Sequence, residues 1–524
     1  MGAPAPLPSL PEFHNEPYRD FAQPENHRSM EEALKLVRGQ SGREYDLLID
    51  GQRLKGEGTF ASRNPARPSE IVGIHQSATA DQARQAVESA AAYFDQWSRS
   101  DAGWRVGLLV KTAAILRARK SECNAWLVLE AGKNWPEAEA DTCEAIDFCE
   151  YYARQMLKFA RPAAPLQLPG EKGELVYLPL GAGVIIPPWN FPLAIMAGMT
   201  TAALVTGNTV IVKPSSDTPT IAALFIDVLL EAGFPPRAIA FITGSGSRIG
   251  DVLVDHLKTR FVSFTGSRDV GLRINERAAS PRKGQIWIKR VVAEMGGKDA
   301  IIVDSEADLD QAVAGVAASA YGFQGQKCSA CSRAIVDRKI YDDFVDRLKS
   351  RVEKIKVGSP EQFGVDMGPV INEKARETIL NYIETGKREG RLITGGGKAE
   401  GEGYFLRPAV IADVDSSARI FQEEIFGPVL AVTKARDFEH ALELANDSEY
   451  GLTGAVYTSN PEKIQAARER FFVGNLYINR KCTGAMVGAH PFGGFNMSGT
   501  DSKAGGPDYL LQFLQAKSIA EKLG

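Results

Sequence analysis

The stretch at residues 181–214, GAGVIIPPWNFPLAIMAGMTTAALVTGNTVIVKP, decides the fold class of this chain. A short apolar run at 184–186 is followed by a longer, helix-like run at 193–205 and then by a second short apolar run at 210–212. This alternation predicts a strand, a helix and a second strand parallel to the first, because the helix carries the chain back to the same end of the sheet.

The alternation continues to residue 293. Further strand-like and helix-like runs follow one another at 221–231, 239–242, 249–256, 261–264, 270–278 and 286–293. They predict an α/β fold with a parallel sheet covered by helices on both faces, and ligands bind such sheets at the carboxyl ends of the strands. A second alternating region at 309–477, with helices near 343–355 and 438–445, predicts a second α/β domain.

The segments around these regions predict an arm, a helical portion and a hairpin. Residues 1–29 are rich in proline, which predicts an extended arm that is either a loose tail or wraps a neighbouring subunit or domain. Residues 30–153 are predicted to be mostly helical. There Asp81 is a candidate cap for a helix with one apolar stripe, formed by Ala83, Ala86, Val87, Ala90 and Phe94. Residues 157–180, with a glycine-containing turn at 170–173, predict a projecting hairpin.

Composition excludes several classes of protein. The chain has 524 residues, 24% of them charged, and its net charge of −4 comes without a basic block, so we expect no nucleic-acid partner. Prolines and Asn190 interrupt the most apolar stretch, 184–205, so we expect no membrane span. The N-terminus has no signal-peptide pattern and six cysteines do not make a disulfide framework, which favours the cytoplasm; a mitochondrial matrix location stays open.

The segment FQGQKCSACSR at residues 323–333 contains the candidate nucleophile. A thiolate is a strong nucleophile and its pKa falls beside cations, and Cys328 directly follows Lys327. A buried, inert thiol is the alternative for any single cysteine. Cys331 completes a C-x-x-C pattern, but the other cysteines and the histidines form no cluster with zinc-ligand spacing, so we expect no metal and disfavour a redox pair. A cysteine protease would need a histidine signature that is missing.

Two upstream motifs complete the chemistry. Glu294, in EMGGK, is a candidate base, and Asn190, in PWNFP, is a candidate hydrogen-bond donor. A nucleophile, a base and an amide are the equipment for oxidising an aldehyde through a thioester. The segment 244–250 is similar to a dinucleotide-binding loop but has one residue too many for the G-x-G-x-x-G pattern. The segment 264–267 could present backbone N–H groups to a pyrophosphate, although each segment alone is equally well an ordinary turn.

Seven motifs occur in an order that resembles the aldehyde dehydrogenase superfamily over residues 45 to 500. They are PWNFP at 188–192, KPS at 213–215, FTGS at 264–267, EMGGK at 294–298, GQKC at 325–328, EIFGP at 424–428 and PFGG at 491–494. The resemblance implies a Rossmann-type NAD-binding domain (30–156 and 181–293), an α/β catalytic domain (294–480) and a small β oligomerisation flap (157–180 and 499–524).

The resemblance also implies residue roles. Cys328 attacks the aldehyde carbon, Asn190 and the Cys328 N–H hold the oxyanion, and Glu294 activates the hydrolytic water. NAD is implied as cofactor, and the residues implied to bind it are Ile186, Pro187, Pro188, Trp189, Lys213, Ser215, Ser216, Gly246, Thr265, Gly266, Ser267, Val270, Met295, Gly296, Glu424 and Phe426. Many NAD-preferring relatives have a glutamate where this chain has Ser216, so use of NADP stays open.

Within the superfamily the chain resembles the branch that oxidises L-glutamate γ-semialdehyde to L-glutamate in proline catabolism. The shared segments are FHNEP at 13–17, EAIDF at 144–148, YGFQGQKCSA at 321–330, NRK at 479–481 and TGA at 483–485. The substrate-binding residues implied by this resemblance are Glu144, Phe191, Lys327, Ser329, Gly484, Ala485 and Phe492. It also implies a homo-oligomer and admits a proline dehydrogenase as partner.

Two other functions remain open at this point. One is the same chemistry on another small semialdehyde, such as succinate semialdehyde. The other is a thiol hydrolase or a structural protein on the same scaffold. A scaffold that had lost the activity should have lost Cys328, Glu294 or Asn190, and the chain retains all three.

Overall fold

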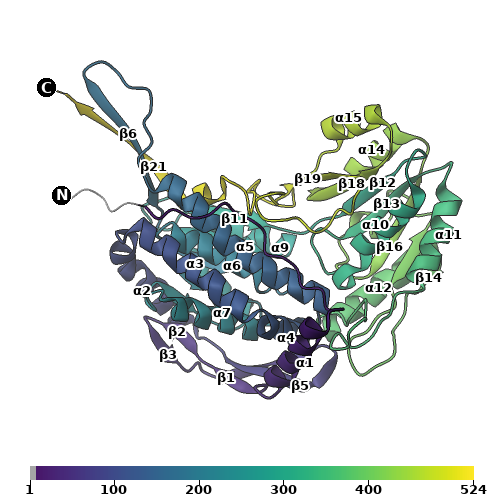
Figure 1. Ribbon diagram of the computed structural model, residues 1–524, viewed down its shortest axis with the longest axis horizontal. Coiled ribbons are helices and arrows are strands. Elements are labelled where there is room, and N and C mark those ends of the chain that lie inside the picture. Colours follow the sequence, from purple (N-terminus) through teal and green to yellow (C-terminus); the bar gives the residue numbers. More distant parts are fainter. Residues whose placement is uncertain (1–6, 524) are drawn as a thin grey trace.

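The computed structural model describes residues 7–523 and shows two lobes, each built on a seven-stranded sheet (Figure 1). The predicted arm begins outside this range, since residues 1–6 are not described. The first lobe carries the N-terminal half of the chain. The second carries most of the C-terminal half, and a two-stranded ribbon projects from the body.

The first sheet has the strand order β11-β10-β7-β8-β9-β2-β3. Its parallel strands are β7 (Ala182–Ile186), β8 (Thr209–Val212), β9 (Ile239–Phe241), β10 (Phe261–Thr265) and β11 (Arg290–Glu294). The strand order reverses at β7, which lies between β10 and β8, and a reversal of this kind opens a crevice for ligands at the carboxyl ends of the strands.

Helices cover both faces of this sheet, as predicted. They are α2 (Ala80–Ser98), α3 (Ala102–Ala118), α4 (Lys120–Ala131), α5 (Trp135–Phe159), α6 (Ala194–Val205), α7 (Pro219–Ala232), α8 (Gly246–Asp255) and α9 (Arg268–Ala279). Val184 packs in a core with α2, α8 and α9, whereas its neighbour Ile185 packs in a core with α3 to α7. Successive strand residues point to opposite faces, so a continuously apolar strand fits a sheet buried on both sides.

The second sheet has the order β14-β15-β16-β13-β12-β18-β19. Its strands are β12 (Asp299–Val303), β13 (Cys331–Asp337), β14 (Arg391–Thr394), β15 (Ala409–Ala412), β16 (Val429–Ala435), β18 (Thr453–Tyr457) and β19 (Asn475–Ile478), all parallel except β14. The helices of this lobe are α10 (Leu309–Tyr321), α11 (Tyr341–Val352), α12 (Glu373–Glu389), α13 (Arg419–Gln422), α14 (Phe438–Asn446) and α15 (Pro461–Arg470). The prediction of a second α/β unit is confirmed.

The prediction of a mostly helical portion from 30 to 153 is wrong between residues 43 and 76. Five strands lie there: β1 (Arg43–Tyr45), β2 (Leu47–Ile49), β3 (Gln52–Leu54), β4 (Thr59–Asn64) and β5 (Arg67–Gln76). Three of them have only three residues, too few to display a strand period in the sequence. The helix predicted after Asp81 is present as α2, but Thr79 caps it rather than Asp81, in a capping box with Gln82. Tyr93 is buried in its stripe, whereas Phe94 is half-buried.

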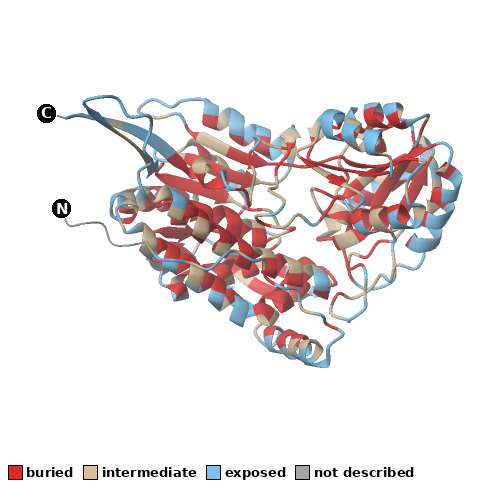
Figure 2. Cartoon of the chain, turned by 45° about the horizontal axis from the view of Figure 1, so that its top comes forward, coloured by how far each residue is buried: buried red, intermediate tan, exposed pale blue. Residues whose placement is uncertain are grey.

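Two further boundaries differ from the sequence predictions. Helix α1 (Pro24–Arg38) takes up the last part of the predicted extended arm. The predicted hairpin at 157–180 is present only in part: α5 continues to Phe159, and the chain then reverses at Gly170 with one isolated antiparallel bridge, Ala163 to Leu175. Strand β6 (Glu171–Pro179) pairs instead with the C-terminal strand β21 (Leu514–Lys522), in an antiparallel ribbon whose outer part is exposed (Figure 2).

Candidate active site

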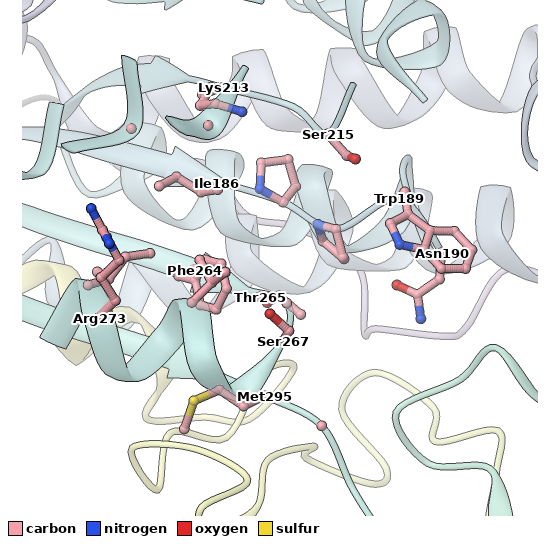
Figure 3. A pocket seen from close by; sticks show the side chains of 18 of the residues that line it. Ile186, Trp189, Asn190, Lys213, Ser215, Phe264, Thr265, Ser267, Arg273 and Met295 are labelled. Atoms are coloured by element: carbon pink, nitrogen blue, oxygen red, sulfur yellow. The ribbon is translucent and has the colours of Figure 1, made fainter. Parts of the chain in front are cut away.

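A cavity of about 770 Å³ lies at the carboxyl ends of β7, β8 and β10 (Figure 3). Every residue that the sequence analysis assigned to the cofactor lines it, from Ile186 on β7 to Phe426 in the second lobe. Asn190 and Cys328 line the same cavity. The first lobe supplies most of the wall, and the second lobe adds Cys328, Glu424 and Phe426, so the cavity lies between the two sheets.

The loop before Cys328 is held in a strained backbone conformation. Phe323, Gln324 and Gly325 have φ angles of 49°, 58° and 67°, in the left-handed region that residues with a Cβ seldom adopt. The Gln324 side chain compensates for this strain by donating hydrogen bonds to the carbonyls of Gly132 (3.1 Å) and Pro369 (2.7 Å). A Cβ on Gly325 would lie 2.4 Å from the carbonyl oxygen of Gly427, so this position requires glycine.

Asn190 is tied to the cysteine loop. Its side chain is buried, and Nδ2 donates a hydrogen bond to the Gln326 carbonyl at 3.0 Å. The Gln326 side chain in turn accepts from the Ile371 N–H at 2.9 Å. The Asn190 side-chain amide is therefore held by Gln326, which lies two residues before Cys328, and Asn190 and Cys328 line the same cavity.

The thiol of Cys328 does not have the cationic neighbour that the sequence suggested. Lys327 turns away and pairs with Glu137 on α5 at 2.7 Å. Burial raises the pKa of Cys328, and the negative charges of Asp299, Glu424 and Glu294 raise it further. Cys328 is consequently a thiol at neutral pH and needs a base to take its proton. Cys331 is buried in β13, with its Sγ 3.5 Å from the Arg333 carbonyl.

Glu294 ends β11 outside the lining of the cofactor cavity. Its Oε1 accepts a hydrogen bond from Ser502 Oγ at 2.7 Å, whereas Oε2 is buried without a hydrogen-bond partner among residues 7–523. Burial raises the pKa of Glu294 to about 8, against the opposing effects of Ser502 and Lys503. A carboxyl group with a raised pKa and one free oxygen is suited to accept a proton from water near neutral pH.

Two parts of the cavity offer donors for a dinucleotide. Lys213 is buried, and its Nζ contacts the Pro214 carbonyl at 3.2 Å; burial lowers the pKa of Lys213 to about 8. Helix α9 starts after Ser267 without a side-chain cap from the described residues, which leaves backbone N–H groups at its first turn. Free N–H groups at a helix start suit a pyrophosphate.

Glu424 closes the opposite end of the cavity. Its Oε1 accepts from the Gly297 N–H at 3.0 Å, and burial raises the pKa of Glu424 to about 7. A Cβ on Gly296 would lie 2.2 Å from the Glu424 carboxylate, so glycine allows this close approach. Phe426, with a φ of 56°, stands edge-on to Trp189 with their ring centroids 5.5 Å apart.

The sequence analysis missed five lining residues: Asp217, Asp251, Val254, Arg273 and Ile274. Three more, Ser247, Gly250 and Phe264, lie within the glycine-containing segments that it named but were not assigned individually. Asp217 bears on cofactor choice, because it follows the exposed Ser216 and accepts from Asn372 Nδ2 at 2.9 Å. The available signal was a carboxylate four residues after Lys213.

The residues assigned to the substrate are not among those that line this cavity. Phe191 follows Asn190, and the Lys327 ammonium lies 5.9 Å from the centre of its ring. Glu144 is half-buried on α5; burial, with Asp141 nearby, raises the pKa of Glu144 to about 8. Lys133 was missed: it is fully buried, 3.8 Å from the Phe191 ring centre and 3.0 Å from Asp141 Oδ2.

The loop after β19 contacts the residue that follows Cys328. Cys482 Sγ lies 3.3 Å from the carbonyl oxygen of the buried Ser329, which places the 483–485 loop beside the cysteine loop. Gly484 has a φ of 76°, and its carbonyl accepts from Arg480 at 3.1 Å. Ala485 and Phe492 are half-buried, and Phe492 is held by backbone hydrogen bonds to Ala504.

Among residues 7–523 there is no group of three or more histidine, cysteine, aspartate or glutamate side chains that could hold a metal ion. No helix in the described part of the chain combines the length and apolarity needed to cross a membrane.

Comparisons with known proteins identify the family. The model of the aldehyde dehydrogenase family matches residues 53–519. A 1-pyrroline-5-carboxylate dehydrogenase of Anoxybacillus flavithermus is 56% identical over 509 residues, which are 97% of this chain and 99% of the relative.

Solved structures agree with this. A point mutant of the 1-pyrroline-5-carboxylate dehydrogenase of Thermus thermophilus has a TM-score of 0.97 and 49% identity, over 98% of this chain and all of that one. The enzyme from Thermus with bound NAD has a TM-score of 0.96, 49% identity and the same coverage. Proline utilization A from Bdellovibrio bacteriovorus has a TM-score of 0.96 and 43% identity over 98% of this chain, but over only 54% of its own. The protein belongs to the aldehyde dehydrogenase family.

Proposed function

We propose that this protein oxidises L-glutamate γ-semialdehyde, the open form of 1-pyrroline-5-carboxylate, to L-glutamate with NAD. The observation that carries the proposal is that Cys328 and Asn190 line a cavity with the residues assigned to NAD, while Lys327, next to Cys328 in the chain, pairs with Glu137 of α5. The full-length similarity to 1-pyrroline-5-carboxylate dehydrogenases supports this choice of substrate.

Cys328 Sγ attacks the aldehyde carbon, and the carbonyl oxygen becomes an oxyanion. Asn190 Nδ2 and the Cys328 N–H hold this oxyanion, and one such donor typically contributes ~10²–10³ in rate. Because the pKa of the Cys328 thiol is raised, its proton must leave to a base as the carbon–sulfur bond forms. NAD, when bound, supplies the hydride acceptor for the oxidation.

Glu294 then serves the hydrolysis of the Cys328 thioester. Its carboxylate takes a proton from water, the resulting hydroxide attacks the thioester carbon, and Cys328 leaves with a proton. The Ser502 hydroxyl holds one carboxylate oxygen and leaves the other free for this task. The pKa of about 8 makes Glu294 strong enough as a base yet partly ionised at neutral pH.

The residues of the cavity fit NAD. Lys213 would donate to hydroxyls of the adenosine ribose, the first turn of α9 with Gly266 and Ser267 would bind the pyrophosphate, and Glu424 would accept from the nicotinamide ribose. The fit is supported by Gly266 and Gly296, since a Cβ at either would lie within 2.6 Å of a cavity-wall side chain. We assign the choice between NAD and NADP to Ser216 and Asp217. A carboxylate at this place repels the 2′-phosphate that only NADP carries.

The substrate has a carboxylate and an ammonium at the end opposite its aldehyde. We assign the carboxylate to the Ser329 hydroxyl and the backbone N–H groups of Gly484 and Ala485, with Lys327 adding positive charge. The ammonium is assigned to Glu144. Phe191 and Phe492 would flank the aliphatic middle of the substrate.

The remaining assignments concern assembly. We propose that the ribbon of β6 and β21 serves as an oligomerisation flap, with 30–156 and 181–293 as the NAD-binding domain and 294–480 as the catalytic domain. Leu166 and Leu168, in the segment before β6, are 90% and 56% exposed, which supports a covering partner subunit. A cytoplasmic enzyme supplied by a proline dehydrogenase stays a prediction.

A panel of aldehydes with NAD and with NADP tests the function. We expect kcat/KM for glutamate γ-semialdehyde with NAD to exceed that for propanal and for succinate semialdehyde by at least about tenfold, because charge-assisted hydrogen bonds of one end group are worth ~1.5–3 kcal/mol. A preference for succinate semialdehyde would show that it is the substrate instead. Hydrolysis of an ester without NADH formation from any of the aldehydes would show that the protein is a hydrolase.

A further inference from the structure

We propose that the N-terminal arm is part of the substrate site: residues 13–18 clamp the loop 483–488 against α5 and thereby set substrate affinity. The proposal rests on the proposed function, because it assigns the carboxylate of the aldehyde substrate to this loop. In Figure 1 the arm is the dark trace that crosses the helical lobe between the N-terminus and α1.

Asn15 bridges the two parts of the clamp. Its Nδ2 donates to Asp147 Oδ2 on α5 at 2.8 Å and to the Val487 carbonyl at 3.0 Å. One amide group thus joins three segments that are more than a hundred residues apart in the chain. The Asp147 carboxylate also accepts from the Glu16 N–H at 2.6 Å, so its second oxygen holds the arm itself.

Two aromatic contacts flank this bridge. Phe13 packs edge-on against Tyr151 of α5, with ring centroids 5.1 Å apart. Gly488, with a φ of 80°, approaches both rings so closely that a Cβ there would lie 3.1 Å from Phe13 and 3.0 Å from Tyr151. On the other side of the bridge, Tyr18 donates from its hydroxyl to Met486 Sδ at 3.4 Å.

The arm is itself firmly attached. Both oxygens of the buried Glu16 carboxylate are paired, one with Lys120 at 2.8 Å and the other with Arg117 at 2.7 Å. Burial desolvates these groups, and the two cations together hold the pKa of Glu16 below its usual value. The arm is therefore fixed to the helical lobe and can hold the loop 483–488 in a constant position relative to α5.

The position of the clamp explains its effect on the substrate. Asp147 lies three residues after Glu144 on α5, so both project from one face of the helix. Val487 lies two residues after Ala485. Asn15 consequently fixes the distance between the proposed ammonium partner, Glu144, and the backbone N–H groups proposed to bind the carboxylate. An aldehyde without charged end groups binds neither Glu144 nor these N–H groups, so a change in the distance between them should not affect its binding.

The test compares steady-state kinetics of Asn15→Ala with glutamate γ-semialdehyde and with propanal. We expect KM for the semialdehyde to rise about 3–10-fold, since both hydrogen bonds of the amide are lost, while kcat/KM for propanal stays within about twofold. Arg19→Ala is the matched control: it removes the arm's hydrogen bond to Ser121 Oγ, away from the loop, and should leave both substrates unchanged.

A charge swap separates the clamp from simple attachment of the arm. In the double variant Asn15→Asp with Asp147→Asn, the bond between arm and α5 can re-form, but the Val487 carbonyl then faces a carboxylate instead of a donor. The semialdehyde KM should stay raised in this variant. Recovery of the wild-type KM would overturn the proposal, as would an equal rise for propanal in Asn15→Ala.

Two further measurements keep the result interpretable. If Asn15→Ala is poorly folded, Tyr18→Phe removes the Met486 contact from a ring that is 57% exposed, and should raise the semialdehyde KM about twofold. An unchanged KM there would also count against the clamp. The wild-type substrate preference reports on the proposed function, whereas the ratio of variant to wild type reports on the clamp. If another carboxylate-bearing aldehyde is the preferred substrate, the same ratios are measured with it.

Discussion

The proposed cofactor cavity takes most of its wall from loops that follow neighbouring strands of one sheet, whereas the proposed substrate side draws on α5, the cysteine loop and the segment 481–492. Sheet topology alone brings the first set together at one edge. The second set meets through side-chain pairs such as Glu137 with Lys327 and Lys133 with Asp141. Cofactor binding should therefore respond little to changes on the substrate side, and the reverse should also hold. Cys328 lies at the border between them.

Replacement of Cys328 should have the largest effect on activity. Cys328→Ala should abolish aldehyde oxidation, by on the order of 10⁴-fold or more in kcat, because the covalent step is lost. Its affinity for NAD, measured by fluorescence titration, should remain within a fewfold of wild type. Cys331→Ala is the matched control and should stay active. An essential Cys331 would return the redox-pair hypothesis.

Replacement of Glu294 should give the next largest effect. Glu294→Gln retains the size of the side chain but cannot accept a proton from water, so turnover should fall by ~10²–10⁴. Acylation precedes this step, and we expect a pre-steady-state burst of NADH followed by slow turnover in stopped-flow absorbance. If burst and turnover fell equally, Glu294 would not be the base for thioester hydrolysis.

The pH dependence of the same residue sharpens this assignment. Burial raises the pKa of Glu294 to about 8, so the carboxylate, which is the form proposed to act as the base, becomes dominant only above that pH. The rate of thioester hydrolysis in single-turnover experiments should rise across this pKa, from about one pH unit below it to one above, in the wild type. The rise should be absent in Glu294→Gln; if it persisted, another group would control the step.

The substrate side should respond to changes that spare the cofactor. Ser329→Ala removes a proposed donor to the substrate carboxylate, and Gly484→Val puts a branched side chain at a φ of 76° next to Lys481. Both should raise KM for glutamate γ-semialdehyde roughly tenfold or more. KM for NAD and kcat/KM for propanal should change much less. Equal losses with both aldehydes would place the carboxylate site elsewhere.

The same contrast explains how far the sequence could predict the structure. Motifs such as those around Asn190, Lys213 and Gly266 follow strands, so the lining of the cavity was predictable from order and topology. Lys133 was not, because a lone lysine gives no sign of being buried between two rings and an aspartate. The pairing of β6 with β21 joins segments more than three hundred residues apart, and no local pattern encodes such a partner; only the family resemblance placed 157–180 and 499–524 in one flap.

The smallest expected effect concerns the choice between NAD and NADP. Ser216 is exposed at the cavity wall, and the neighbouring Asp217 is held by Asn372. A second carboxylate at 216 would add repulsion toward a 2′-phosphate, screened by solvent at this exposed position. Ser216→Glu should therefore lower kcat/KM with NADP by about 3–10-fold relative to NAD, and Ser216→Gln, of the same size without the charge, should not. If glutamine had the same effect, the cause would be steric. If neither variant changed the ratio, residue 216 would not face the ribose, and Asp217 would be left as the carboxylate that discriminates between the two cofactors.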